Sequence, residues 1–377
     1  MQTLVRSLLI YRLTGSATIL GAMAFADLIP LLLFSLIGGA LADRYQKKSI
    51  LLMANILSML VALGVALSIT LGYLQSEHGG ALWILVIASI LQGSAMGFSL
   101  PSQQAILPEI VGKEQLMNAV SLNGMSMNVM RFLAPAVAGF LTDMIGFDAV
   151  YYTMAGLFCL SFVLLSLMKP TGVIGVQKHS AIADVKQGIH YIRHDSTIFI
   201  ILLLALAGVV LSLPYILLMP IFADDVLKVG ASGLGVLMSA SGVGAIAGSL
   251  VMASRPNRNR GFLLIVSSIL IGLALLGFSL SAVWVLSLIL ISLVGFTHAS
   301  RMTLSNTLLQ YYTQPEYRGR VMSVYMMEIG LMSFGAFGAG LLADAFGAPR
   351  ALGSFSVLLI IISLAALIFL PKIRKLD

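Results

Sequence analysis

The segment Gly39-Ala-Leu41-Ala-Asp43-Arg44-Tyr-Gln-Lys47-Lys48 ends a long apolar run and begins a polar connection. About 20 apolar residues are enough to cross the hydrocarbon core of a bilayer as an α-helix. Lys and Arg gather in the cytoplasmic connections of membrane proteins. The cations in this segment therefore indicate the inner end of a membrane-spanning helix.

The pattern G-x-L-x-D of this segment recurs at intervals of three predicted helices. It reads Gly139 to Asp143 at the end of the fifth apolar segment and Gly340 to Asp344 at the end of the eleventh. The eighth carries Gly248-Ser-Leu250, with Met252 where the aspartate would stand. One such match could arise by chance, but recurrence at the same helix end is typical of inverted repeats nested in two parallel halves.

The composition of the whole chain also indicates a membrane protein. Of the 377 residues, 59% are hydrophobic and 10% are charged, whereas about a quarter are charged in soluble domains. Residues 1–13 would rise only about 20 Å as a helix, so we interpret them as the second half of a first helix. The predicted fold is an all-α transmembrane bundle of twelve helices with the first one truncated. The full spans are predicted at 17–42, 49–73, 81–102, 116–142, 149–168, 197–223, 230–253, 261–280, 283–309, 321–343 and 351–370.

Charges in the connections predict the orientation. Lys and Arg are concentrated in alternate connections and in the C-terminal tail, and acidic residues in the others. The central linker and the C-terminus are therefore predicted to be cytoplasmic, in a protein that crosses a bacterial cytoplasmic (inner) membrane many times. The linker, residues 169–195, separates an N-terminal half (1–168) from a C-terminal half (196–377), and helical spacing of its apolar residues predicts an amphipathic surface helix. The same bias explains the net charge of +7 without nucleic-acid binding.

Residues 39–48 resemble the loop signature of the major facilitator superfamily, G-x-L-a-D-r-x-G-r-k, with Gln46 at the usual second glycine. The opening Tyr11-Arg-Leu-Thr-Gly15-Ser16 and the segment 107–120 are similar to bacterial exporters of the enterobactin-exporter and macrolide-efflux type. The resemblance implies a secondary transporter that opens to one side of the membrane at a time. It also implies a cytoplasmic gate motif, for which simple topogenic anchoring is the alternative, formed by Gly39, Asp43, Arg44, Lys47 and Lys48.

Two further signatures of such exporters survive in part. The Gly-Pro-x-x-Gly-Gly signature of the fifth helix reads Ala134-Pro135-Ala-Val-Ala138-Gly139, so two glycines have become alanine. The R-x-x-q-G signature of the fourth helix keeps Gln92-Gly93 but has Ser89 in place of the arginine. If that arginine assists proton transfer in the family, this protein must do without such a group or use another one.

Six ionisable side chains fall inside predicted spans: Arg6, Asp27, Arg131, His298, Arg301 and Glu328. A charge at the bilayer centre costs at least about 2.5–3.5 kcal/mol, so each of them needs a partner or a water-filled cavity. Their depths, at about 1.5 Å of rise per residue, predict an Arg6–Asp27 pair, with Arg131 at a similar level, and an Arg301–Glu328 pair.

These pairs suggest sites for a coupling proton. A carboxylate that is separated from its basic partner, or that loses water, binds a proton more readily, so Asp27 and Glu328 are the candidate proton sites. Static ion pairs are the alternative. For His298 we favour an interhelical hydrogen bond over a proton relay. For Arg131 and Arg301, binding of an anionic substrate is the alternative role.

Polar and small residues predict the inner surface and the packing of the bundle. Helical spacing places four polar residues of the fourth helix on one face, with Ser94 off it, and the resemblance implies that the fourth and tenth helices line a central cavity. The predicted lining residues are Ser89, Gln92, Ser99, Gln103, Thr297 and Asn306, and the predicted packing residues are Pro135, Gly139, Gly248 and Gly340. Pro214 and Pro220 are predicted to permit bending of the seventh helix.

The predicted function is secondary active transport, namely proton-coupled efflux of a small amphipathic compound, drug-like or siderophore-like, by alternating access. An importer or uniporter of the same fold, and a non-transporting membrane sensor or scaffold, are the alternatives. The chain lacks H-E-x-x-H, G-x-S-x-G and Walker motifs, so we predict no enzyme. We expect no cofactor and no metal, and as partners a small-molecule substrate, the lipid bilayer and a proton or cation gradient, in a monomer.

Overall fold

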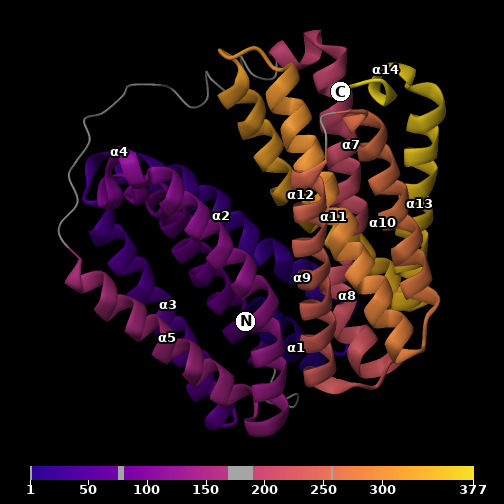
Figure 1. Cartoon of the computed structure of the whole chain (residues 1–377). Helices are drawn as coiled ribbons and strands as arrows, with labels where there is room; N and C mark the ends of the chain where they lie inside the picture. Colours follow the sequence, from indigo (N-terminus) through magenta and orange to yellow (C-terminus); the bar gives the residue numbers. More distant parts are fainter. Residues whose placement is uncertain (1, 75–79, 169–189, 256–257) are drawn as a thin grey trace. The chain divides into compact units, whose positions relative to one another are not determined.

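The computed structural model describes residues 2–74, 80–168, 190–255 and 258–377, apart from some side chains inside α2, α4 and α12. Within these ranges the chain is α-helical and contains no strand (Figure 1). The predicted all-α class is therefore confirmed. Most of the predicted linker, including its amphipathic helix, lies outside the described ranges, and residues 190–194 are helical.

The chain forms two compact units. Unit 1 comprises Met1–Gln177 together with Gly230–Gly235, and unit 2 comprises Lys178–Val229 together with Val236–Asp377. Each unit has its own set of packed helices.

Unit 1 contains five helices from the N-terminal part of the chain. The long helices pack in two pairs, α2 along α4 and α3 along α5 (Figure 1). Ser16 caps the start of α2 by accepting a hydrogen bond from the Ile19 amide, the usual way to satisfy a free amide there. The helices are α1 (Gln2–Thr14), α2 (Ala17–Arg44), α3 (Lys47–Thr70), α4 (Ala81–Ile145) and α5 (Phe147–Leu167).

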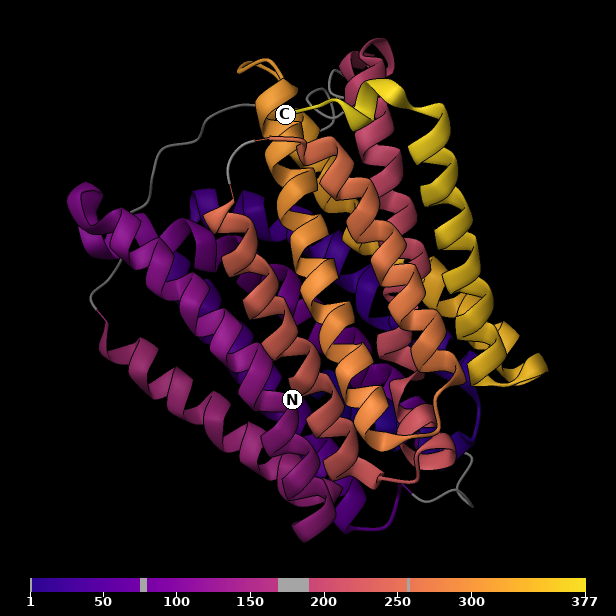
Figure 2. The same ribbon diagram turned by 45° about the vertical axis from the view of Figure 1, so that its right-hand side comes forward.

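Helix α4 differs from the prediction. Spans predicted at 81–102 and 116–142 lie in one assigned helix of 65 residues. A straight helix of this length would measure about 97 Å, about three times the hydrocarbon thickness of a bilayer, and the ribbon of α4 turns back on itself in both views (Figures 1 and 2). Residues 103–115 contain only one proline and one glycine, too few breakers to end the helix there.

Unit 2 contains the remaining helices, apart from the first turn of α9. Helix α10 packs against both α11 and α13 (Figure 2). The elements are α7 (Ser196–Ser212), α8 (Pro214–Ile221), the π-helical turn η1 (Phe222–Val226), α9 (Gly230–Ser254), α10 (Arg260–Leu280), α11 (Trp284–Tyr312), α12 (Arg318–Phe346), α13 (Ala348–Phe369) and α14 (Pro371–Arg374).

The predicted seventh span is broken into α7, α8 and η1. Helix α7 ends at Ser212 and α8 begins at Pro214. Proline has no amide hydrogen and its ring disturbs the preceding turn, which accounts for the break at Leu213, while a bend at Pro214 stays a prediction. Pro220 lies inside α8, just before the π-helical turn.

Ten helices in the described ranges are long and apolar enough to cross a membrane. Helix α1, with 13 residues, is too short, and the predicted fifth span lies in α4 but is not one of the ten. The fold is thus a polytopic bundle, while the number twelve stays a prediction.

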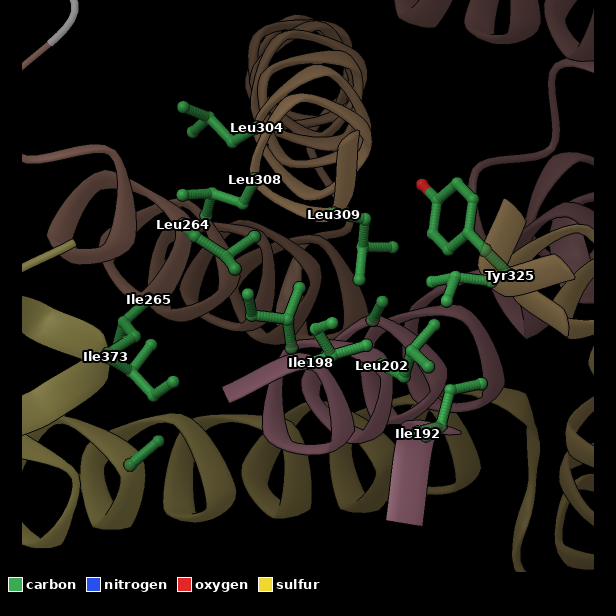
Figure 3. Packing of buried hydrophobic residues seen from close by; sticks show 14 residues of the cluster. Ile192, Ile198, Leu202, Leu264, Ile265, Leu304, Leu308, Leu309, Tyr325 and Ile373 are labelled. Atoms are coloured by element: carbon green, nitrogen blue, oxygen red, sulfur yellow. The ribbon is translucent and has the colours of Figure 1, made fainter. Parts of the chain in front are cut away.

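One end of unit 2 is held by a cluster of buried apolar side chains. Helices α7, α10, α11, α12 and α14 all contribute to it, and Tyr325 of α12 brings the one hydroxyl group visible among the labelled side chains (Figure 3). Because lipid is as apolar as these side chains, close packing stabilises such helices more than burial does. Labelled members are Ile192, Ile198, Leu202, Leu264, Ile265, Leu304, Leu308, Leu309, Tyr325 and Ile373.

Candidate functional site: buried charges in each unit

In unit 1, Arg6 of α1 and Asp27 of α2 form a partly buried ion pair. The Arg6 Nη2 atom donates to Asp27 Oδ2, and the Arg6 side chain is 9% exposed and that of Asp27 32%. The pair predicted from helix depth is therefore confirmed. The other terminal nitrogen of Arg6, Nη1, is buried with no hydrogen-bond partner, so the site has an unused donor.

Helix α4 touches α2 at the level of this acid because of a glycine. A Cβ atom on Gly93 would lie 2.3 Å from the backbone carbonyl oxygen of Asp27, and one on Gly97 would lie 2.9 Å from that of Leu31. Small residues let the backbones of membrane helices approach closely. The surviving glycine of the fourth-helix signature therefore sets the position of α4 beside Asp27.

Other buried polar atoms in unit 1 lack partners. Gln92 Nε2 donates to Ser58 Oγ at 3.3 Å, but Gln92 Oε1, Ser89 Oγ and the Tyr151 hydroxyl have none. Tyr151 of α5 lies within electrostatic range of both Arg6 and Asp27. Leaving such groups unpaired costs about 1–3 kcal/mol each, and ordered water commonly satisfies them.

The predicted cavity-lining residues of α4 differ in exposure. Ser89 and Gln92 are buried, Ser99 is half-buried and Gln103 is exposed. The lining role itself stays a prediction. Tyr151 was missed because its span carries other hydroxyl groups, among them Tyr152 and Thr153, and the sequence alone did not distinguish the buried one.

In unit 2, Arg301 of α11 is held by the backbone of α7. Its side chain is almost fully buried, and Nη1 donates to the carbonyl oxygen of Ala205 at 3.0 Å. A Cβ atom on Gly208 would lie 2.4 Å from Nη1 and 2.6 Å from Cζ. The guanidinium group therefore lies in a notch that exists only because residue 208 has no side chain.

The predicted Arg301–Glu328 ion pair is wrong as a direct contact. Both residues lie in the described ranges and are buried, yet they form no ion pair, and Glu328 Oε2 and Arg301 Nε are both without partners. They still lie within electrostatic range of each other and of Tyr325, one turn before Glu328. The guanidinium group instead donates to a backbone carbonyl oxygen of α7. A sequence pattern does not reveal a backbone acceptor of this kind.

Other predicted residues have local roles or fall outside the description. The Thr297 hydroxyl donates within its own helix to Leu293 at 2.7 Å, and Asn306 accepts from Gln310. His298 is half-buried, and its predicted role is untested. The side chains of Arg131, Asp43 and Arg44 lie outside the described ranges.

Of the gate motif, Lys48 has the best-defined contacts. Its Nζ atom donates to the carbonyl oxygens of Ser166, at 2.7 Å, and Met168, at the end of α5. A cation at a helix C-terminus satisfies free carbonyls and complements the helix dipole. Lys47 is buried, and Gly39 lies within α2.

One aspartate of the repeated pattern caps a helix. Asp143 accepts from the backbone amides of Ala231, at 3.3 Å, and Ser232, at 2.6 Å, in the part of α9 that belongs to unit 1. The backbones meet closely there, because a Cβ atom on Gly139 would lie 2.2 Å from the Ala231 carbonyl oxygen. A carboxylate at a helix N-terminus pairs with free amides and the positive end of the dipole.

Glycines make a second close contact inside unit 2, between α9 and α11. Cβ atoms on Gly248 and Gly244 would lie 2.2 Å and 1.8 Å from the carbonyl oxygens of Phe296 and Ser292. This contact resembles the glycine contact between α2 and α4 in unit 1. Gly340 is buried in α12, and Pro135 lies inside α4.

The described residues contain no group of three or more His, Cys, Asp and Glu side chains that could hold a metal ion. The sites around Arg6 and Asp27 and around Arg301 contain buried charged groups and hydrogen-bonding atoms without partners. They can bind protons, water or polar groups of a solute.

Comparison with known proteins places these features in a family. Residues 1–377 match the profile described as "transmembrane secretion effector". The staphyloferrin A transporter of Staphylococcus aureus is 28% identical over 91% of this chain and 84% of the relative. The macrolide efflux protein A of Streptococcus pyogenes is 24% identical over 97% and 90%, and the enterobactin exporter of Escherichia coli 25% over 96% and 83%.

The fold is also that of solved transporters. A bacterial homologue of the human lysosomal transporter Spinster, in an inward-facing and unoccupied conformation, has a TM-score of 0.76 at 13% identity and covers 99% of this chain and 94% of that one. The resemblance drawn from residues 39–48 and 107–120 is confirmed. The chain therefore belongs to the transmembrane secretion effector family of the major facilitator superfamily, and it is a multi-pass membrane transporter and not an enzyme.

Proposed function

We propose that this transporter exports a small amphipathic compound, drug-like or siderophore-like, across a bacterial cytoplasmic membrane in exchange for protons. The observation that carries the proposal is the Arg6–Asp27 ion pair between two helices of unit 1. Ionisable groups within membrane helices commonly mark proton relays and substrate paths. The names of the relatives, which concern siderophores and a macrolide, support the substrate class.

The pair supplies a chemical switch. While Arg6 contacts Asp27, the charged carboxylate is stabilised; when the two separate, a carboxylate in apolar surroundings favours its protonated form. A transporter that alternates between two conformations can thus take up a proton in one and release it in the other. The unpaired Arg6 Nη1 and the Tyr151 hydroxyl nearby are suitable partners for the water that would carry the proton.

The composition suits an amphipathic substrate. The chain has 20 methionines and 18 phenylalanines. Methionine side chains are flexible and polarizable, and they adapt to ligands of varied shape. An apolar surface with a few fixed charges would accept such compounds without strict recognition of one functional group.

The test is efflux from a bacterial host that lacks its own pumps, with a macrolide, staphyloferrin A and enterobactin as probes. We expect the chain to lower cell-associated levels of at least one probe, and Asp27→Asn to abolish this effect while the protein still reaches the membrane. Glu316→Gln, which changes an exposed carboxylate, is the matched control and should leave efflux intact. Full, proton-dependent efflux by Asp27→Asn would refute the proposed role of Asp27.

A further inference from the structure

The contacts of Arg301 define a binding place on α7, here called the α7 seat, made of the Ala205 carbonyl oxygen and the Cα face of Gly208. The guanidinium donates to that oxygen at 3.0 Å. It also lies so close to Gly208 that an added Cβ would be within 2.9 Å of Nη1, Cζ and Nε. Glycine in a helix interior lowers helix stability by about 1 kcal/mol relative to alanine. At position 208 the missing side chain leaves the space that the guanidinium group fills.

Glu328 is left without a cation while Arg301 occupies the seat. Its Oε2 atom is buried with no hydrogen-bond partner. Arg301 from α11 and Tyr325 from its own helix lie within electrostatic range of it, and α11 also carries His298, one turn before Arg301. Helix α7 has no ionisable residue, α8 has only Tyr215, whose hydroxyl meets Ser241 at 3.0 Å, and α13 has only Arg350 in its first turn.

We propose that Arg301 alternates between two partners, the α7 seat and Glu328, and that Gly208 is the positioning residue that makes the first partner available. With Arg301 on the seat, Glu328 holds a proton, because a buried carboxylate without a counterion is costly whereas its neutral acid is not. When Arg301 leaves the seat, it pairs with Glu328, and the carboxyl group releases its proton to water. This inference rests on the proton-coupled transport proposed above.

The break in the seventh span makes such a movement mechanically reasonable. The α7 seat lies within two turns of the point where α7 ends, at Ser212. The Ser212 hydroxyl donates to the Gly208 carbonyl oxygen at 2.6 Å, in the last turn of α7. A helix interrupted in this way can tilt as a separate segment, and a tilt of α7 moves the seat relative to α11 and α12.

The experiment measures the infrared carbonyl-stretch band of the protonated Glu328 carboxyl group in the purified full-length protein, without substrate or gradient. Loss of the band in Glu328→Gln assigns it. The wild type should show the band at neutral pH. Gly208→Ala should lose it, because the new methyl group displaces the guanidinium from the seat toward Glu328. Gly338→Ala, where a Cβ would meet its nearest neighbour at an ordinary 3.7 Å, is the matched control and should keep it.

A double variant separates a displaced arginine from general damage. Gly208→Ala with Arg301→Gln has no guanidinium to displace, so the band should return at neutral pH. An unchanged band in Gly208→Ala, or a band that does not return in the double variant, would overturn the proposal. Because the band is read without transport, failure of proton-coupled export would show instead in the Asp27→Asn efflux test.

Discussion

At the scale of single residues, glycines control where charged side chains can lie. Gly93 allows α4 to rest on the backbone of Asp27, and Gly208 allows the Arg301 guanidinium to rest on α7. In lipid, each of these charges needs a fixed partner. The absence of a side chain at two positions is therefore as important for the charge sites as the charged residues are.

Replacing Gly93 by alanine should weaken unit 1. The new Cβ would lie 2.3 Å from the Asp27 carbonyl oxygen, and overpacking of this kind costs about 1–3 kcal/mol. The thermal unfolding temperature of the purified protein should fall. Gly64→Ala on α3, with nothing within 4 Å of the new Cβ, should keep or raise that temperature, because alanine is favoured over glycine in a helix; equal decreases in the two variants would contradict the account.

The Arg6–Asp27 pair predicts a non-additive result. Arg6→Gln leaves an uncompensated carboxylate; breaking a fully buried pair costs about 3–5 kcal/mol, and this partly buried pair should cost less. Adding Asp27→Asn removes that charge, so the double variant should be more stable than Arg6→Gln alone. Thermal unfolding of the two proteins in the same detergent measures the difference. A double variant that is less stable than Arg6→Gln would contradict an ion pair between Arg6 and Asp27 in the folded protein.

At the scale of elements, the interrupted seventh span is the clearest departure from regular helices. Pro214 starts α8, and a single residue, Leu213, separates it from the end of α7 at Ser212. An irregularity at Pro214 could be predicted, because proline removes a hydrogen bond wherever it occurs. The helical connection between the two predicted spans of α4 was not predicted. Its polar residues favoured a non-helical connection, but residues 103–115 contain only one proline and one glycine to end a helix.

Pro214→Ala should join α7 and α8 into a continuous helix. Alanine is favoured over proline in a helix interior by about 3 kcal/mol, so thermal stability should be kept or raised. The rate of transport should fall by about tenfold, a rise in barrier of about 1.4 kcal/mol, because the break no longer lets α7 tilt. Pro349→Ala, at the start of α13, should change neither quantity. A Pro214→Ala protein with the wild-type rate would show that the break is not used.

At the scale of the whole molecule, the fold was largely predictable and the charge sites only in part. Lipid forces nearly every span to be a helix, and the repeated G-x-L-x-D pattern indicated the family. Helix depth was enough to pair Arg6 with Asp27. It failed for Arg301, because every residue has a backbone carbonyl and the sequence does not show that the one of Ala205 accepts the hydrogen bond. In addition, Gly208 looks like any other small residue in a membrane helix.

The most direct test of proton-coupled export is to record proton and substrate movement together in reconstituted liposomes. A pH-sensitive dye inside the vesicles would report protons while a labelled probe, identified by the efflux assay, reports substrate. The account predicts that each downhill movement of the probe drives protons in the opposite direction, and that Asp27→Asn loses this coupled proton movement. Probe movement at the full rate with no accompanying proton flux in the wild-type protein would contradict it.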